Sequence, residues 1–120
     1  MKKYLSKRKS AFRCAGIGVA KLFRESHARI HALAVVCVVV SGFIFKISGL
    51  EWCILLLCMG GVLMAEAFNT ALEKLSDKVC PEQNPLIGDA KDLAAGAVLI
   101  KAITSVIAGL IIFIPKFIGC

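Results

Sequence analysis

Three stretches of this 120-residue sequence are long and apolar enough to cross a lipid bilayer as helices. They cover residues 30–47, 52–72 and 93–114, and the third stretch alone would make about 33 Å of helix. Hydrophobic residues make up 58% of the chain and the mean hydropathy is +0.81, values typical of a membrane protein. Backbone groups in lipid must be hydrogen-bonded within the segment. The sequence therefore predicts an all-α membrane protein, with residues 1–120 as a single domain.

Positive charge is concentrated at the N-terminal end of the chain. The net charge is +7, and nine of the fifteen lysines and arginines precede the first apolar stretch. A basic region can bind nucleic acid, but no nucleic-acid motif accompanies this one, so we expect no nucleic-acid partner. Beside membrane spans, such a bias marks the cytoplasmic side. We therefore expect the N-terminus and the polar connection 74–92 in the cytoplasm, and the C-terminus outside.

The segment 8–24 has the pattern of an amphipathic helix. Phe12, Val19 and Phe23 share one face, while Arg13 and Lys21 lie on the other. This pattern is typical of a helix that lies in the membrane interface instead of crossing the bilayer.

Polar residues recur at regular intervals from the second apolar stretch to its polar end. Glu66, Asn69, Glu73 and Asp77 follow one another at steps of three, four and four residues, so a helix places all four on one face. A charged side chain at the centre of a membrane helix costs about 2.5–3.5 kcal/mol on insertion scales, so such residues usually mark a functional site. For Glu73 and Asp77, a solvated helix end beside two lysines is an alternative.

Carboxylates on the cytoplasmic side suggest phosphate chemistry. Glu25 and Glu73 offer the hard oxygen ligands that Mg²⁺ takes together with phosphate oxygens. Glu66 would lie deeper, with few water contacts, where a carboxylate is a stronger base toward a hydroxyl group.

Other polar residues could assist this chemistry. Asn69 could position a phosphate or a hydroxyl, Lys91 could neutralise phosphate charge, and Asp92 could orient that lysine or the metal. His27 and His31 have no metal-ligand partner at helical spacing except each other, so we interpret them as a surface pair and not as a zinc site.

Several motifs together resemble the prokaryotic diacylglycerol kinase family, which includes the undecaprenol kinases. They are AEAFNTALEKLSD (65–77), AKDLAAGAV (90–98), FRE…ARIH (23–31), FKISGLEW (45–52) and GLIIFIPK (109–116). One departure is the loop PEQNPL (81–86), where the family commonly has PEYHPL.

The resemblance implies a fold, an activity and partners. It implies a homotrimeric enzyme of the bacterial inner membrane, with a surface helix and three transmembrane helices in each subunit. Such enzymes transfer the γ-phosphoryl group of ATP to the hydroxyl of a membrane lipid and require Mg²⁺. The family name favours diacylglycerol as the acceptor, with undecaprenol as the alternative.

The resemblance also assigns roles to individual residues. Glu66 resembles the catalytic base, with Asn69, Lys91 and Asp92 as further catalytic residues. Glu25 and Glu73 resemble the metal ligands, and Trp52 and Ala95 are expected with Glu66 beside the lipid. The expected nucleotide-binding residues are Lys7, Cys14, Glu25, Asn69, Glu73, Asp77, Glu82, Gln83, Asn84, Lys91 and Asp92.

Two other classes of function fit part of the pattern. A membrane-embedded glutamate near an asparagine and a lysine also describes the path of a small ion-coupled transporter. A membrane adaptor without enzymatic activity could use the basic helix alone. A transporter needs polar residues through the full depth of the membrane, and the outer half of this chain has almost none.

Overall fold

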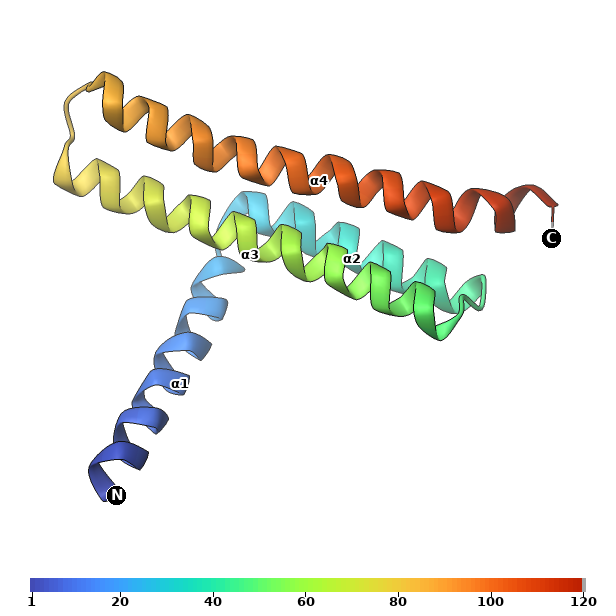
Figure 1. Ribbon diagram of the computed structural model, residues 1–120, viewed down its shortest axis with the longest axis horizontal. Coiled ribbons are helices and arrows are strands. Elements are labelled where there is room, and N and C mark those ends of the chain that lie inside the picture. The colour runs from blue at the N-terminus through green and yellow to red at the C-terminus, as the bar shows by residue number, and fades with distance from the viewer. Residues whose placement is uncertain (120) are drawn as a thin grey trace.

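The computed structural model describes residues 1–119, and within them it contains four helices and no strand (Figure 1). In chain order the helices are α1 (Lys2–Leu22), α2 (Ser26–Ile44), α3 (Gly49–Val79) and α4 (Pro85–Gly119). Helix α3 lies between α2 and α4 and packs against both, and consecutive helices of this bundle run antiparallel. Helix α1 leaves the start of α2 and projects away from the bundle.

The three predicted spans are confirmed as helices long and apolar enough to cross a membrane. Their ends differ from the sequence prediction. Helices α3 and α4 have 31 and 35 residues, about 46 and 52 Å, so both extend beyond a hydrocarbon core of about 30 Å. The extra length lies mainly at the end where α3 and α4 are joined. The prediction that Glu66 to Asp77 lie on one helix is thus confirmed, whereas residues 90–92, which were expected in the polar connection, are also helical.

The first predicted span, residues 30–47, was placed too far along the chain, because α2 ends at Ile44. Lys46 has a φ angle of 52°, a left-handed conformation that cannot continue a helix. Helix α3 then starts with a capping box: the Ser48 hydroxyl accepts from the Glu51 backbone N–H, and the Glu51 carboxylate accepts from the Ser48 backbone N–H.

The prolines of α4 behave differently at its two ends. Pro85 is the first helical residue, where its missing N–H costs nothing, and the Asn84 side chain accepts from the Leu86 backbone N–H at 2.9 Å. We expected Pro115 to end the last span, but α4 continues through it to Gly119. Lys116 supports this turn, since its Nζ donates to the Ile112 carbonyl at 3.4 Å.

The best-packed part of the bundle lies at the end away from the α3–α4 connection. Ile47, Leu55 and Ile112 are buried there, with several aromatic rings around them. Phe45 lies edge-on to Phe113 with ring centroids 5.9 Å apart. Lys116 of α4 also pairs with Glu51 of α3 at 2.6 Å, so this end is closed by both apolar and ionic contacts.

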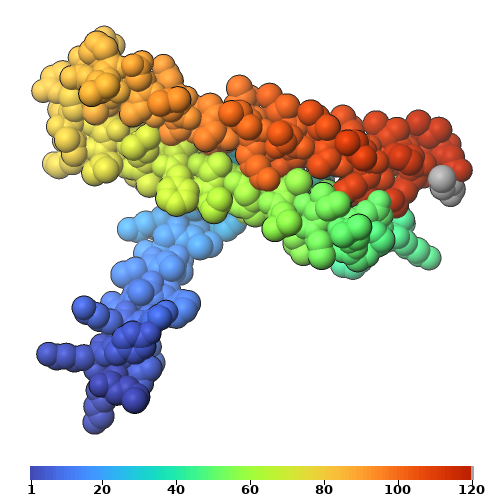
Figure 2. All heavy atoms as spheres, in the orientation of Figure 1, coloured from blue at the N-terminus to red at the C-terminus, as the bar shows by residue number. Residues whose placement is uncertain are grey.

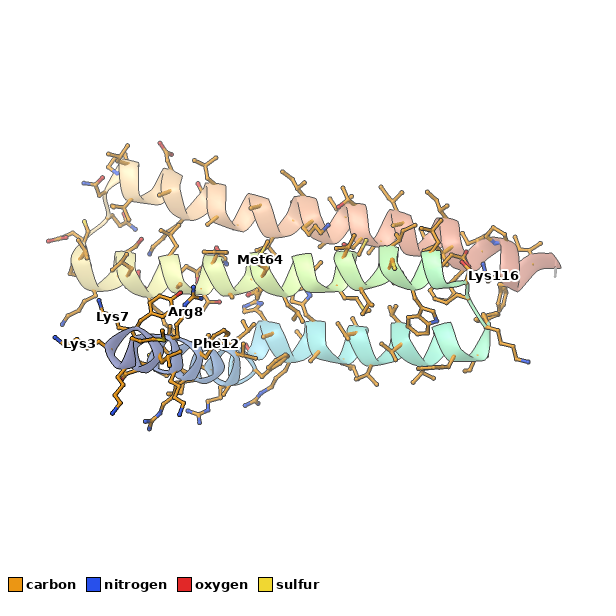
Figure 3. All side chains as sticks on the ribbon, turned by 60° about the horizontal axis from the view of Figure 1, so that its bottom comes forward. Lys3, Lys7, Arg8, Phe12, Met64 and Lys116 are labelled. Atoms are coloured by element: carbon orange, nitrogen blue, oxygen red, sulfur yellow. The ribbon has the colours of Figure 1, made fainter. Side chains whose placement is uncertain are left out.

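Helix α1 is the least packed element of the chain. None of its residues is buried, and the space-filling view shows it standing clear of the bundle (Figure 2). Figure 3 shows Lys3, Lys7, Arg8 and Phe12 on α1, while Lys116 lies at the far end of the bundle. Only the C-terminal part of α1 approaches α3, across a hollow that Lys21 and Thr70 help to line.

Candidate functional site

The most buried acidic residue of the described chain is Glu66, at 5% exposure. It is held in the middle of the long helix α3 and faces α2, where His31 is half-buried. The distance from His31 Nε2 to Glu66 Oε2 is 3.6 Å, an ion-pair distance. A carboxylate so far removed from solvent needs a polar partner, and in this chain the imidazole supplies it.

An apolar groove begins at His31 and continues toward the opposite end of the bundle. It lies between α2, α3 and α4, has a volume of about 430 Å³, and is lined almost entirely by apolar side chains. His31 lines it from α2, Met59 from α3 and Val106 from α4. The groove therefore has a hydrocarbon-like interior and a polar end at His31, whose partner Glu66 lies next to the groove without lining it.

Glu66, Asn69, Glu73 and Asp77 form a polar stripe along one face of α3. Beyond Glu66, this stripe continues toward the α3–α4 connection. The Asn69 Nδ2 donates to Glu73 Oε1 at 3.5 Å, one helical turn further along α3. The Asn69 Oδ1 is buried and has no hydrogen-bond partner in residues 1–119. A buried acceptor without a partner is costly, so this oxygen is available to a ligand.

Glu25 reaches the same region from the start of α2. It precedes the first residue of that helix, and its Oε1 lies 2.9 Å from Lys74 Nζ of α3. Lys74 neighbours Glu73 in sequence, so Glu25 approaches the stripe from its side. The sequence predicted that these residues share the cytoplasmic end, but not this ion pair.

Lys91 joins α4 to the end of the stripe. Its Nζ pairs with Asp77 Oδ1 of α3. Lys91 also borders a polar hollow of about 510 Å³ against the connecting loop, which Glu82, Gln83 and Asn84 help to line. A cation, a carboxylate and loop amides thus meet at the end of the bundle beyond the apolar spans.

Two groups in this loop shift each other's ionisation. The Cys80 Sγ donates a hydrogen bond to Glu82 Oε2 at 3.3 Å. This carboxylate raises the pKa of the Cys80 thiol above its ordinary value. Hydrogen bonds, first from its own backbone N–H and then from Cys80, lower the pKa of Glu82 below its ordinary value.

Other predicted site residues are not brought to this region within one chain. Lys7 and Cys14 are exposed on α1, and Ala95 and Asp92 are exposed on α4. Trp52 packs on Phe43 at the opposite end of α3, with ring centroids 5.0 Å apart. Fourteen residues of helix, roughly 21 Å, separate Trp52 from Glu66, so these two residues would contact different parts of a bound lipid. The expected place of Trp52 beside the lipid stays a prediction.

The oxygen donors fit a magnesium ion in kind. Glu25, Glu73 and the unpartnered Asn69 Oδ1 are hard donors of the type that Mg²⁺ binds. Within residues 1–119, however, no three His, Cys, Asp or Glu side chains are grouped closely enough to hold a metal by themselves. Phosphate oxygens or a second chain would have to complete the shell.

His31 is the functional residue that sequence reasoning missed. The interpretation of His27 and His31 as a surface pair is wrong for His31, which contacts Glu66 instead. A signal was present, because residues equally far from the turn of an antiparallel hairpin lie at the same depth. His31 precedes Ser48 by 17 residues and Glu66 follows it by 18.

Comparison with known proteins identifies the family of the chain. The sequence model of prokaryotic diacylglycerol kinase matches residues 13–113. An undecaprenol kinase of Bacillus subtilis is 42% identical over 85% of this chain and 84% of its own length. A diacylglycerol kinase of Synechocystis is 34% identical over 91% of this chain, which spans 63% of that longer protein. The diacylglycerol kinase of Escherichia coli K12 is 30% identical over 82% of this chain and 80% of its own length. The chain belongs to the prokaryotic diacylglycerol kinase family and is a membrane lipid kinase.

Proposed function

We propose that this kinase transfers the γ-phosphoryl group of ATP to a lipid hydroxyl that reaches Glu66 from the bilayer. The observation that carries the proposal is the position of Glu66, buried at the junction between an apolar groove and a polar stripe. The hydrocarbon chain of the acceptor would lie along the groove. The nucleotide would approach from the side of Asn69, Glu73 and Asp77.

Residues at different depths in the membrane have different roles in the proposed reaction. The Glu66 carboxylate accepts the proton of the lipid hydroxyl, whose oxygen then attacks the γ-phosphorus in line with the leaving oxygen. Asn69 lies between Glu66 and the nucleotide end, where it forms a hydrogen bond with the phosphate or with the lipid hydroxyl. Lys91 and Asp92 lie at the nucleotide end, where Lys91 neutralises phosphate charge. Positioning and charge neutralisation supply most of the catalysis.

Magnesium fits this scheme as a partner of the nucleotide. Glu25 and Glu73 would hold the ion together with phosphate oxygens, and bound Mg²⁺ would neutralise charge on the transferred group. The present ion pair of Glu25 with Lys74 would then have to open or share its carboxylate.

Undecaprenol is the first acceptor to test. The relative that is 42% identical is an undecaprenol kinase, whereas the two other relatives described above, at 34% and 30%, are diacylglycerol kinases. Both lipids present a hydroxyl that can reach the depth of Glu66. Diacylglycerol therefore remains the second candidate.

The same proposal includes a homotrimer in the bacterial inner membrane. Lys7, Cys14 and Asp92 are not brought to Glu66 within one chain, so a site that uses them needs residues of a second copy. The N-terminus and the α3–α4 connection would face the cytoplasm, where ATP is present, and the C-terminus would face outward.

The test is the transfer of labelled phosphate from ATP to a lipid alcohol in mixed micelles, with undecaprenol and diacylglycerol supplied in separate reactions. Glu66→Gln keeps the size of the side chain but replaces one carboxylate oxygen with an amide NH₂ group and so removes the base. We expect its turnover to fall by about 10²–10⁴-fold. Asp89→Asn, which removes an exposed carboxylate outside the stripe, is the matched control. If Glu66→Gln retains full turnover with both lipids, Glu66 is not the base.

A further inference from the structure

The contact between His31 and Glu66 has no role in the proposed mechanism so far. It joins two helices at the mouth of the apolar groove, and both partners are shielded: the Glu66 side chain is 7% exposed and the His31 side chain 26%. The imidazole is therefore placed to hold the Glu66 carboxylate in a fixed orientation.

The surroundings of the pair contain no competing cation. In the chain up to residue 119, His31 is the only basic side chain within ion-pair distance of Glu66. His27 lies one turn earlier on α2 and is exposed. On α3, the next carboxylate of the stripe is Glu73, which Asn69 contacts.

Helix α4 contributes charges only nearer the nucleotide end or on another face. Lys91 pairs with Asp77, while Asp89 and Asp92 are exposed. Lys101 lies against Gly61 of α3, five residues beyond Glu66 in the direction of the outer side. None of these groups forms an ion pair with His31 or Glu66.

We infer that His31 is the positioning residue of the catalytic base, an inference that depends on the proposed function of Glu66. His31 Nε2 lies 3.6 Å from Glu66 Oε2, and this contact holds the carboxylate in place while Oε1 stays free to accept the hydroxyl proton.

Kinetics of three variants test this role. His31→Phe removes the polar contact, and we expect the kcat to fall by about 10–100-fold, as for other residues that orient a functional group, with the KM for ATP unchanged. His31→Gln restores a polar N–H group at this position, so it should recover most of the kcat. His27→Gln, at the only other histidine of the chain, should leave the kcat unchanged.

A second measurement does not depend on turnover. Because the chain has two histidines, the NMR signals of both imidazoles can be compared in micelles at one fixed pH, with His27 as an internal reference. Glu66→Gln changes the group that His31 contacts. The imidazole signals of His31 should then shift while those of His27 stay the same.

The outcomes separate the inference from the function beneath it. Full activity of Glu66→Gln overturns the proposed base and the role of His31 with it. If Glu66→Gln is inactive but the His31 signals do not move, or if His31→Gln has as low a kcat as His31→Phe, only the role of His31 is overturned. Shifted His31 signals together with the recovered kcat of His31→Gln support it.

Discussion

Glu73 is the residue whose place in the stripe gives the most direct test of metal binding. Its carboxylate accepts from Asn69 and is exposed enough to meet a solvated ion. We predict that Glu73→Ala raises the Mg²⁺ concentration needed for half-maximal activity by about tenfold or more. The measurement is phosphoryl transfer against Mg²⁺ concentration at saturating ATP, with Asp89→Ala as the control. An unchanged Mg²⁺ dependence would remove Glu73 from the metal site.

Cys80 offers a prediction about pH that needs no substrate. The hydrogen bond to Glu82 keeps the thiol protonated and raises the pKa of Cys80, so less of the reactive thiolate is present at a given pH. Replacing Glu82 by Ala should lower this pKa and speed alkylation by a maleimide between pH 7 and 9. The measurement uses a variant that keeps Cys80 as its only cysteine. Asp89→Ala in the same background should alkylate at the original rate.

At the scale of single residues, the sequence predicted the stripe but not its partners. The regular spacing of Glu66, Asn69 and Glu73 is a property of one helix and could be read directly. The contacts of Glu66 with His31 and of Glu25 with Lys74 depend on how two helices are rotated against each other. That rotation is set by packing, which no local pattern in the sequence reports.

Between elements, α2 approaches α3 closely at Gly42. A Cβ added there would lie 2.6 Å from the Trp52 ring, which is rigid and has Phe43 beside it. Gly42→Ala should therefore force the helices apart and destabilise the fold by about 1–3 kcal/mol. Unfolding in mixed detergent micelles measures this change. Gly60→Ala is the control, because nothing lies within 4 Å of its added Cβ; an equal loss in both variants would contradict the packing argument.

The ends of the helices were predictable where a side chain or backbone rule acts locally. The Ser48–Glu51 capping box and the start of α4 at Pro85 follow known preferences. The continuation of α4 through Pro115 could not be predicted from such local preferences, because the free-energy cost of a proline inside a helix depends on the contacts made by the rest of the helix. Lys116, held to Glu51 and to the Ile112 carbonyl, stabilises this turn through tertiary contacts.

For the whole molecule, the two connections between spans should be reachable from opposite sides of the membrane. Lys46 lies at the turn between α2 and α3, and Cys80 at the turn between α3 and α4. In a background without other cysteines, we predict that Lys46→Cys reacts with a membrane-impermeant maleimide in right-side-out vesicles. Cys80 should react only in inverted vesicles. Labelling of both from one side would contradict the three-span topology.

The sequence also indicated that one chain is an incomplete unit. Hydrophobic residues buried in residues 1–119 are few, namely Ala28, Ile47, Leu55 and Ile112. Most large apolar side chains of the spans are exposed, as for a chain that meets lipid or further copies. Which faces meet other copies could not be predicted, because lipid and a neighbouring helix select for the same apolar residues.

Helix α3 runs without interruption from Gly49 to Val79 and carries both Glu66 and Glu73. The helix therefore fixes the separation of the two carboxylates at about 10 Å along its axis. If Glu66 is the base and Glu73 a metal ligand, as we propose, a change of acceptor lipid cannot slide one relative to the other, since any shift of α3 moves both. We therefore expect substitutions in the groove walls on α2 and α4 to change the acceptor preference while this spacing stays the same.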